Sequence, residues 1–190
     1  MSKNLRLCID RVFPAKHQDL AQEVAIKANP DNDPTRLPAT KIAVTSRKMW
    51  APGETLRIRF LDGTSAMHTK VIRAAKPWEE HANIFFDFGA HPDAQIRIAF
   101  SADTGSWSAV GTDALVEPWF PAHQPTMNFG WLTEATDDEE YSRVVLHEFG
   151  HALGCIHEHQ SPGAKIKWKK EAVYTAYEGA PNWWTRAEID

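Results

Sequence analysis

The sequence has few cysteines and no long apolar run, and these absences exclude whole classes of protein. Its two cysteines, Cys8 and Cys155, do not make the disulfide framework that holds many small secreted domains together. No apolar run approaches the roughly 20 residues of a transmembrane helix. The first ten residues lack the apolar core of a secretory signal, so we predict no export by the general route and leave the location unassigned.

The sequence also lacks a large excess of charge of either sign. Its formal net charge is −4, which gives no reason to expect nucleic acid or an anionic membrane as a partner. With 190 residues, 43% hydrophobic and 24% charged, the chain has the length and composition of one globular domain with a real core.

The most informative stretch is HEFGHALGCIH, which runs from His147 to His157. His147 and His151 are four residues apart, so on a helix both project from one face, as two ligands of one metal ion must. Glu148 points beside the metal, which suits a general base. Gly154 permits the sharp turn that ends the helix, so that the chain doubles back and offers His157 as a third ligand. Three nitrogens leave the fourth tetrahedral position of zinc open for water, as in a catalytic site.

Two histidines on a helix face are often ordinary surface or core residues, and H-E-x-x-H alone arises by chance. The added glycine and third histidine at fixed offsets make the full motif far more restrictive. The helix is also apolar, and buried histidines in such a setting need a partner. We therefore predict one zinc ion here. The apolar residues around the motif are Val144, Val145, Leu146, Phe149, Ala152 and Leu153.

From these residues and the continuation His157–Pro162, the sequence resembles the metzincin zinc endopeptidases, and most of all their astacin-like, bacterial-type branch. The resemblance runs from about Thr55 to the C-terminus. It implies an α/β (α+β) fold with a twisted, mostly parallel sheet, an antiparallel edge strand and two long helices. It also implies zinc ligation by His147, His151 and His157, with Glu148 as the catalytic base.

One feature of metzincins is missing from this sequence. They carry a methionine-containing turn beneath the zinc, downstream of the third histidine, whereas Met1, Met49, Met67 and Met127 all lie upstream of it. We therefore expect a small, truncated C-terminal lobe.

The sequence also suggests a division of the chain. Residues 1–50 read as an N-terminal arm or pro-like segment with a helix over 17–28, whose inner face would be Leu20, Val24 and Ala28; a first layer of the same domain is the alternative. Residues 51–190 read as the metalloprotease catalytic domain, with an upper lobe to about 156 and a partial lower lobe over 157–190. Cys8 in the arm would cap the zinc as a latency thiolate or be incidental, and the absence of the matrixin switch sequence around it favours the second interpretation.

Alternating and periodic apolar residues predict the elements of the upper lobe. We expect strands over 54–60, 84–88 and 95–100. A helix is expected over 65–82, with Pro77 as an interruption that kinks it.

Two further strands are expected over 106–111 and 126–131. The resemblance implies that the first is the antiparallel edge strand whose free edge binds an extended peptide, with Trp107, Ser108 and Ala109 as the substrate-binding residues. An ordinary edge strand is the alternative.

The remaining segments connect or follow these elements. The loop between these last two strands, which contains Pro118, Pro121, His123 and Pro125, is predicted to be a rigid surface excursion near the cleft. The acidic run 136–140 predicts the N-cap of the zinc helix rather than a calcium site. Helices are expected over 168–177 and from a cap at Asn182.

The predicted function is that of a zinc-dependent endopeptidase acting on peptide or protein substrates, with no nucleic-acid or membrane partner. Zinc would activate water and polarise the scissile carbonyl, and Glu148 would carry the proton to the leaving amine. One alternative is a catalytically impaired zinc-binding or interaction domain derived from a metzincin. The other is a metal hydrolase that acts on non-peptide amides.

Overall fold

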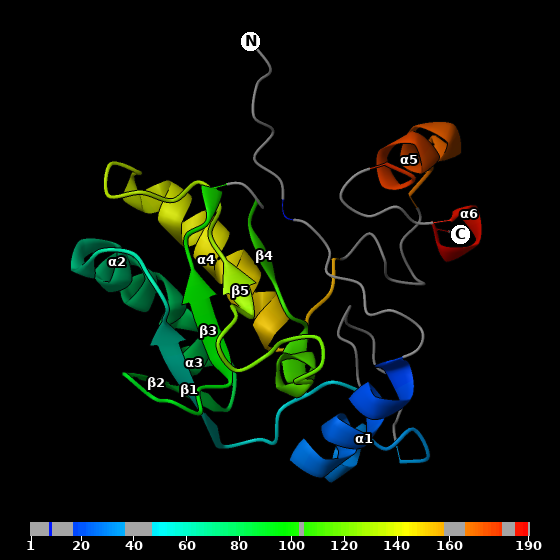
Figure 1. Cartoon of the computed structure of the whole chain (residues 1–190), viewed down its shortest axis with the longest axis horizontal. Coiled ribbons are helices and arrows are strands. Elements are labelled where there is room, and N and C mark those ends of the chain that lie inside the picture. Colours follow the sequence, from blue (N-terminus) through cyan, green and yellow to red (C-terminus); the bar gives the residue numbers. More distant parts are fainter. Residues whose placement is uncertain are drawn as a thin grey trace. The chain divides into compact units, whose positions relative to one another are not determined.

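A five-stranded sheet with the strand order β2-β1-β3-β5-β4 forms the centre of the structure (Figure 1). Its strands are β1 (Glu54–Phe60), β2 (Ile84–Phe88), β3 (Ile96–Ala99), β4 (Trp107–Ser108) and β5 (Met127–Asn128). The pairs β1–β2, β1–β3 and β3–β5 are parallel, and β4 is antiparallel to β5 at the edge. This sheet confirms the predicted α/β fold with an antiparallel edge strand.

The computed structural model describes residues 8, 17–36, 47–102, 105–157, 166–179 and 185–189. The chain divides into two compact units, Met1–Ile156 and His157–Asp190. Residue 50 falls inside the first unit, so a separate role for residues 1–50 stays a prediction.

The sheet buries one apolar face of each inner strand. In β1, Leu56 and Ile58 are fully buried, as the alternation of apolar and charged residues predicts. All four residues of β3 are buried, including the charged Arg97. The Arg97 guanidinium donates to the carbonyl oxygens of Gln124 at 2.7 Å and Phe120 at 2.9 Å, so this buried charge is hydrogen-bonded by the loop above it.

The segment after β4 differs from the predicted surface loop. It begins with a 3-10 helix, η4 (Gly111–Leu115), most of which is buried, and Val116 and Phe120 are buried as well. The exposed residues of this segment are 117–118 and 122–124. The prediction was wrong for the first half because the prolines suggested a solvent-exposed turn, whereas the apolar residues between them join the core.

The predicted helix over 65–82 is two helices, α2 (Ser65–Ala75) and α3 (Pro77–His81). Pro77 occupies the first turn of α3, where its missing N–H costs nothing, and so separates two helices rather than kinking one. The Nε1–H of Trp78 in α3 donates to the carbonyl oxygen of Leu146 at 3.0 Å. This bond fastens α3 to the zinc helix of the predicted motif.

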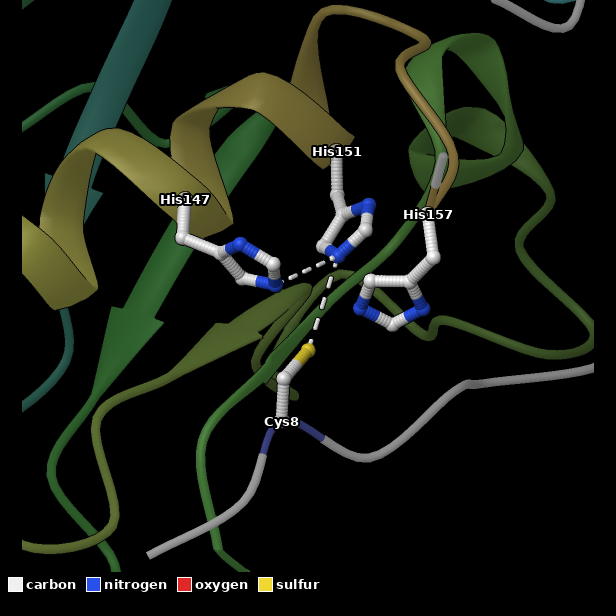
Figure 2. A group of neighbouring side chains, drawn as sticks. All are labelled: Cys8, His147, His151 and His157. Atoms are coloured by element: carbon white, nitrogen blue, oxygen red, sulfur yellow. Dashed lines mark hydrogen bonds between the residues drawn. The ribbon is translucent and has the colours of Figure 1, made fainter. Parts of the chain in front are cut away.

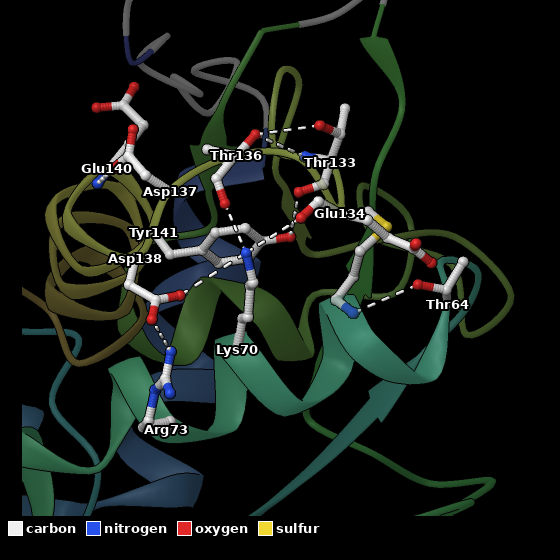
Figure 3. A network of polar contacts seen from close by, with 11 residues as sticks. Thr64, Lys70, Arg73, Thr133, Glu134, Thr136, Asp137, Asp138, Glu140 and Tyr141 are labelled. Carbon is white, nitrogen blue, oxygen red and sulfur yellow. Dashed lines mark hydrogen bonds and ion pairs between the residues drawn. The ribbon is translucent and has the colours of Figure 1, made fainter.

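That helix is α4 (Asp138–Ala152), and a polar network fixes its start (Figure 3). The Asp137 side chain accepts a backbone N–H of the first turn at 2.8 Å, which confirms the predicted N-cap. Lys70 of α2 donates to the carbonyl oxygen of Thr136 at 2.6 Å, and Arg73 of α2 pairs with Asp138 at 2.6 Å. The N-terminus of α4 is therefore held against α2.

The helix α1 (Gln18–Ala28) packs against η4 with a different face from the one predicted. Its buried residues are Ala21 and Ala25, whereas Leu20 is exposed. The small side chains of Ala21 and Ala25 allow α1 to approach η4 closely. They form the contact in place of the larger apolar residues that were predicted. The stretch 5–13, whose sequence is also compatible with a short strand, lies outside the described residues apart from Cys8.

A short 3-10 helix, η2 (Pro30–Asn32), follows α1 and ties it to the next described segment. Asn32 is fully buried. Its side chain donates to the carbonyl oxygens of Ala25 and Met49, both at 2.9 Å, and accepts the N–H of Met49 at 2.9 Å. The amide therefore joins the end of α1 to residue 49 by three hydrogen bonds.

The second unit contains α5 (Lys170–Tyr177) and α6 (Arg186–Ile189). Arg186 pairs with Glu171 and Glu178 and lies over the Tyr174 ring, 4.3 Å from its centroid. The helix predicted over 168–177 is α5, which begins two residues later than predicted. The predicted cap at Asn182 lies outside the described residues. Within the described part of the chain, no helix has the length and hydropathy to cross a membrane.

Candidate metal centre

The last two turns of α4 place His147 and His151 side by side. Their Nε2 atoms are 3.1 Å apart, and their rings lie edge to face with centroids separated by 4.7 Å. His151 is buried and His147 is exposed. Two nitrogens from successive turns thus point at the same place, as the four-residue spacing predicts.

The turn after α4 has the geometry predicted for Gly154, whose φ is +101°. The N–H of Gly154 donates to the carbonyl oxygen of His151 at 2.8 Å, and the N–H of Cys155 donates to that of Gly150 at 2.9 Å. This pair of bonds is the Schellman arrangement with glycine in the left-handed position. The chain therefore reverses immediately after the second histidine.

Four side chains that could hold a metal ion meet beside this turn (Figure 2). The donor atoms of Cys8, His147, His151 and His157 all lie within 4.8 Å of one another. The first three residues belong to the first unit, and His157 follows directly on Ile156 as the first residue of the second.

The distances in this cluster can be compared with those of a zinc site. Two nitrogens bonded to one tetrahedral zinc ion lie about 3.3 Å apart, and a sulfur and a nitrogen about 3.6 Å apart, given bonds of about 2.0–2.1 and 2.3 Å. The separation of the two Nε2 atoms is 3.1 Å, and that between Cys8 Sγ and His151 Nε2 is 3.5 Å. Imidazole and thiolate are also ligands that zinc prefers, so the residues fit the ion.

Glu148 lies next to the same point. Its side chain is 1% exposed, and the Cys8 thiol donates to its Oε2 at 3.5 Å. The Cys8 sulfur is thus equally far from the carboxylate and from His151 Nε2. One atom at this position contacts both the predicted base and a predicted metal ligand.

The structure places Cys8 where the sequence did not lead us to expect it. Its surroundings differ from the matrixin switch, which favoured an incidental thiol, but its sulfur lies within the histidine cluster. The signal in the sequence that could have predicted this position was a thiol in a chain that also has three candidate ligand histidines. Cys155 is the other thiol of the chain, and burial raises the pKa of its side chain, so it remains protonated and apolar at neutral pH.

Trp107 and Ser108 form β4 at the edge of the sheet, and Ala109 follows them. All three side chains are buried, and the N–H of Ala109 donates to the carbonyl oxygen of Thr126 at 2.7 Å. Cys8 forms a parallel β-bridge with Ser106, the residue before β4. The role of these three residues in binding substrate stays a prediction.

A pocket of about 320 Å³ opens beside β4 and was not predicted from the sequence. The Trp107 ring stacks on Phe120 with centroids 6.3 Å apart. The proline-rich segment supplies part of the wall through Trp119, Phe120, Gln124 and Pro125. The lining residues are Ser101, Trp107, Trp119, Phe120, Gln124, Pro125 and Asn128.

Comparison with known proteins identifies the family. The model of the Astacin peptidase family matches residues 43–169, which include the three histidines, Glu148 and β4 but not Cys8. Two solved structures of myroilysin are similar to this chain. One has 43% identity and a TM-score of 0.68, covering 77% of this chain and 70% of its own. The other has 36% identity and a TM-score of 0.66, covering 99% and 67%.

The comparison with curated proteins gave no match. The family match nevertheless covers well over half of the chain, and the two myroilysin structures cover 77% and 99% of it. The chain therefore belongs to the astacin family of peptidases and is a zinc metalloprotease of the metzincin type.

Proposed function

We propose that this chain is an endopeptidase in which His147, His151 and His157 hold one zinc ion and Glu148 is the general base. The observation that carries the proposal is the position of the Glu148 carboxylate. It is buried, and its Oε2 faces the point that His151 Nε2 also faces, with the Cys8 sulfur 3.5 Å from each. A carboxylate without a catalytic task has no reason to be buried beside three metal ligands.

The residues of the site have distinct tasks. His151 donates from Nδ1 to the Cys155 carbonyl oxygen at 2.8 Å, which leaves the lone pair of Nε2 for the metal. Bound to these histidines, zinc supplies a Lewis acid that makes water nucleophilic at neutral pH and polarises the scissile carbonyl. Glu148 accepts the proton of the attacking water and then delivers it to the leaving amine nitrogen.

We propose that the substrate is an extended peptide that adds to the edge of the sheet at β4. The position of β4 at the end of the strand order supports this, because its outer backbone groups are on the side away from β5. The small side chains of Ser108 and Ala109 let a peptide backbone approach closely. Cys8 already forms a parallel β-bridge with Ser106, the residue before β4. This pairing supports the edge as a binding surface.

A second candidate function is a zinc-binding domain that does not catalyse. The observation in its favour is that four protein ligands surround one point, because closed four-ligand zinc sites are typically structural. The buried Glu148 supports the endopeptidase, since a structural zinc ion needs no base.

Substitution of Glu148 by glutamine tests the proposal. Because the Cys8 sulfur contacts both Glu148 and His151, the test uses the full-length Cys8→Ala chain as its reference. Adding Glu148→Gln should leave zinc content unchanged and lower the cleavage of a denatured protein by about 10²–10⁴-fold, because the amide cannot accept the proton. Glu139→Gln, on the exposed first turn of the same helix, is the matched control and should cleave normally.

The result also separates the two candidate functions. Equal cleavage by the Glu148→Gln and reference chains would show that Glu148 is not the base. If the reference chain binds zinc and cleaves no peptide, the non-catalytic zinc-binding domain is the correct alternative.

A further inference from the structure

We infer that the pocket beside β4 is a specificity subsite, which takes one bulky, uncharged and preferably aromatic side chain of a peptide paired with the edge of the sheet. This specificity rests on the proposed endopeptidase function, in which an extended peptide adds to β4. The residues that line the pocket all belong to the first unit of the chain.

The register of the strands shows which side chains share the face on which the pocket lies. Trp107 of β4 pairs with Asn128 of β5, and Asn128 pairs with Ala99 of β3. Paired residues of neighbouring strands point to the same face, and successive residues point to opposite faces. Two of the lining residues, Trp107 and Asn128, therefore share one face, whereas Met127 and its partner Ile98 point to the other.

The second of these faces is the one that α4 covers. Ile98 also pairs with Phe60 of β1. Leu56, four residues before Phe60 in the same strand, points to the same face and pairs with Phe86 of β2. The Phe86 ring contacts that of Phe149 in α4, with centroids 5.1 Å apart. The pocket therefore lies on the face of the sheet away from α4.

Three aromatic side chains contribute to the wall of the pocket. The Trp107 ring stacks on Phe120 with centroids 6.3 Å apart, and Trp119 is the third. Among the described residues, no charged side chain lines the pocket. Its volume of about 320 Å³ is at the small end of the range of roughly 300–1,000 Å³ for ligand pockets. The pocket thus suits one large apolar side chain rather than a longer ligand.

Hydrogen bonds within the protein hold the wall in place. The Asn128 amide donates to the carbonyl oxygens of Ser101 at 2.9 Å and Gly105 at 2.5 Å, and it accepts the N–H of Ser101 at 2.8 Å. Arg97 donates to the carbonyl oxygen of Gln124 at 2.7 Å and so holds the loop that forms the other side. The pocket is therefore preformed, and it selects its occupant by shape and apolar contact.

A peptide that pairs with β4 presents alternate side chains to this pocket. The side chain opposite Trp107 lies on the pocket face, and the one opposite Ser108 lies on the α4 face. Cβ atoms of directly opposite residues are about 4.5–5.5 Å apart and diagonal neighbours about 7–8 Å apart, a distance that aromatic and long side chains span. A small side chain stops short of the pocket. A preference for a large apolar residue should therefore appear at one substrate position and skip the positions next to it.

A hollow that contacts no substrate would have the same outline, and a series of peptides distinguishes the two. One phenylalanine is moved through successive positions of an otherwise alanine-based fluorogenic peptide, and the full-length Cys8→Ala reference chain is assayed on each. At the position that reaches the pocket, phenylalanine should raise kcat/KM about 10–100-fold over alanine, the gain expected from burying its ring. Aspartate at that position should give no gain, because no charged group of the described wall pairs with it.

Two variants of the reference chain assign the gain to the pocket. Gln124→Trp fills the pocket while keeping the bond from Arg97, which is made to the backbone carbonyl. Trp119→Ala removes part of the wall. Each should make kcat/KM nearly equal for phenylalanine and alanine at this one position and leave the preferences at adjacent positions unchanged. An unchanged preference in both variants would overturn the subsite.

The control removes an aromatic side chain elsewhere on the sheet. Phe85 is 51% exposed and belongs to β2, at the opposite end of the strand order from β4. Phe85→Ala should keep the full preference for phenylalanine. Loss of the preference in this variant as well would show that it does not come from the pocket.

Binding separates the subsite from the proposed chemistry. With Glu148→Gln added to the reference chain, fluorescence anisotropy of labelled peptides gives Kd without cleavage. The phenylalanine peptide should bind at least about tenfold more tightly than the alanine peptide, and Gln124→Trp should remove the difference. Equal Kd values would refute the subsite.

The two proposals fail in distinguishable ways. Tighter binding of the phenylalanine peptide, with no cleavage by the reference chain, would support the subsite and refute the endopeptidase. Cleavage of the phenylalanine and alanine peptides at equal rates, whatever the position, would refute the subsite and leave the endopeptidase standing.

Discussion

The Nδ1–H of His151 donates to the backbone carbonyl oxygen of Cys155, four residues further along the chain, at 2.8 Å. This bond fixes the tautomer and the ring orientation of the proposed ligand. The carbonyl is in place because Gly154, with φ at +101°, turns the chain immediately before it. The glycine of the motif thus positions His151 as well as allowing the chain to reach His157.

Gly154→Ala should therefore weaken both folding and zinc binding. A side chain at this positive φ costs about 1–3 kcal/mol, and any relaxation of the turn moves the Cys155 carbonyl away from His151. Thermal unfolding and zinc titration measure the two effects. Gly179→Ala is the control, because an added Cβ there meets nothing nearer than 3.9 Å. If the two variants behave alike, the turn does not position the ligand.

Removal of zinc should destabilise the protein. The purified chain should contain about one zinc ion, and free zinc at 100 times its dissociation constant should stabilise the fold by about 2.7 kcal/mol. Elemental analysis and thermal unfolding with and without a chelator check this. His151→Ala should abolish the zinc-dependent shift. His123→Ala, which changes an exposed histidine of the loop before β5, should retain it. A zinc-dependent shift of full size in His151→Ala would overturn the site.

A third prediction concerns the ion pair between half-buried Lys48 and buried Asp113. Burial raises the pKa of Asp113, although the attraction of Lys48 lowers it, so the desolvation of this carboxylate outweighs its ion pair. Because the folded pKa lies above the unfolded value of 3.8, the unfolded chain loses this proton first as pH rises. Ionisation of Asp113 therefore disfavours the fold increasingly from about pH 4 toward neutrality.

Asp113→Asn removes this titration. Its free energy of unfolding relative to the wild type should rise as pH increases over that window, measured by urea unfolding of metal-free chains so that the histidine site contributes equally to both. Lys48→Met removes the compensating charge and should make the decline of stability with pH steeper than in the wild type. Parallel pH profiles for the wild type and Asp113→Asn would show that Asp113 ionises equally easily in both states.

Much of the geometry of the candidate metal centre was readable from the sequence because it is local. His147, Glu148 and His151 lie on one helix, so their relative positions follow from its period of 3.6 residues. Gly154 acts within the next turn. The strands β1 and β2 were likewise predicted with their observed bounds, since alternating burial leaves a period of two in the sequence.

Only the tertiary structure decided which distant segments meet these elements. Cys8 is 140 residues from Glu148, and no local periodicity relates the two. The bridge from Cys8 to Ser106 brings the thiol to the site, and a backbone pairing between distant segments leaves no pattern in either one. For the same reason, the burial of Phe120 and the inner face of α1 escaped prediction. Burial depends on what packs against a residue, and a single segment of sequence does not contain its packing partner.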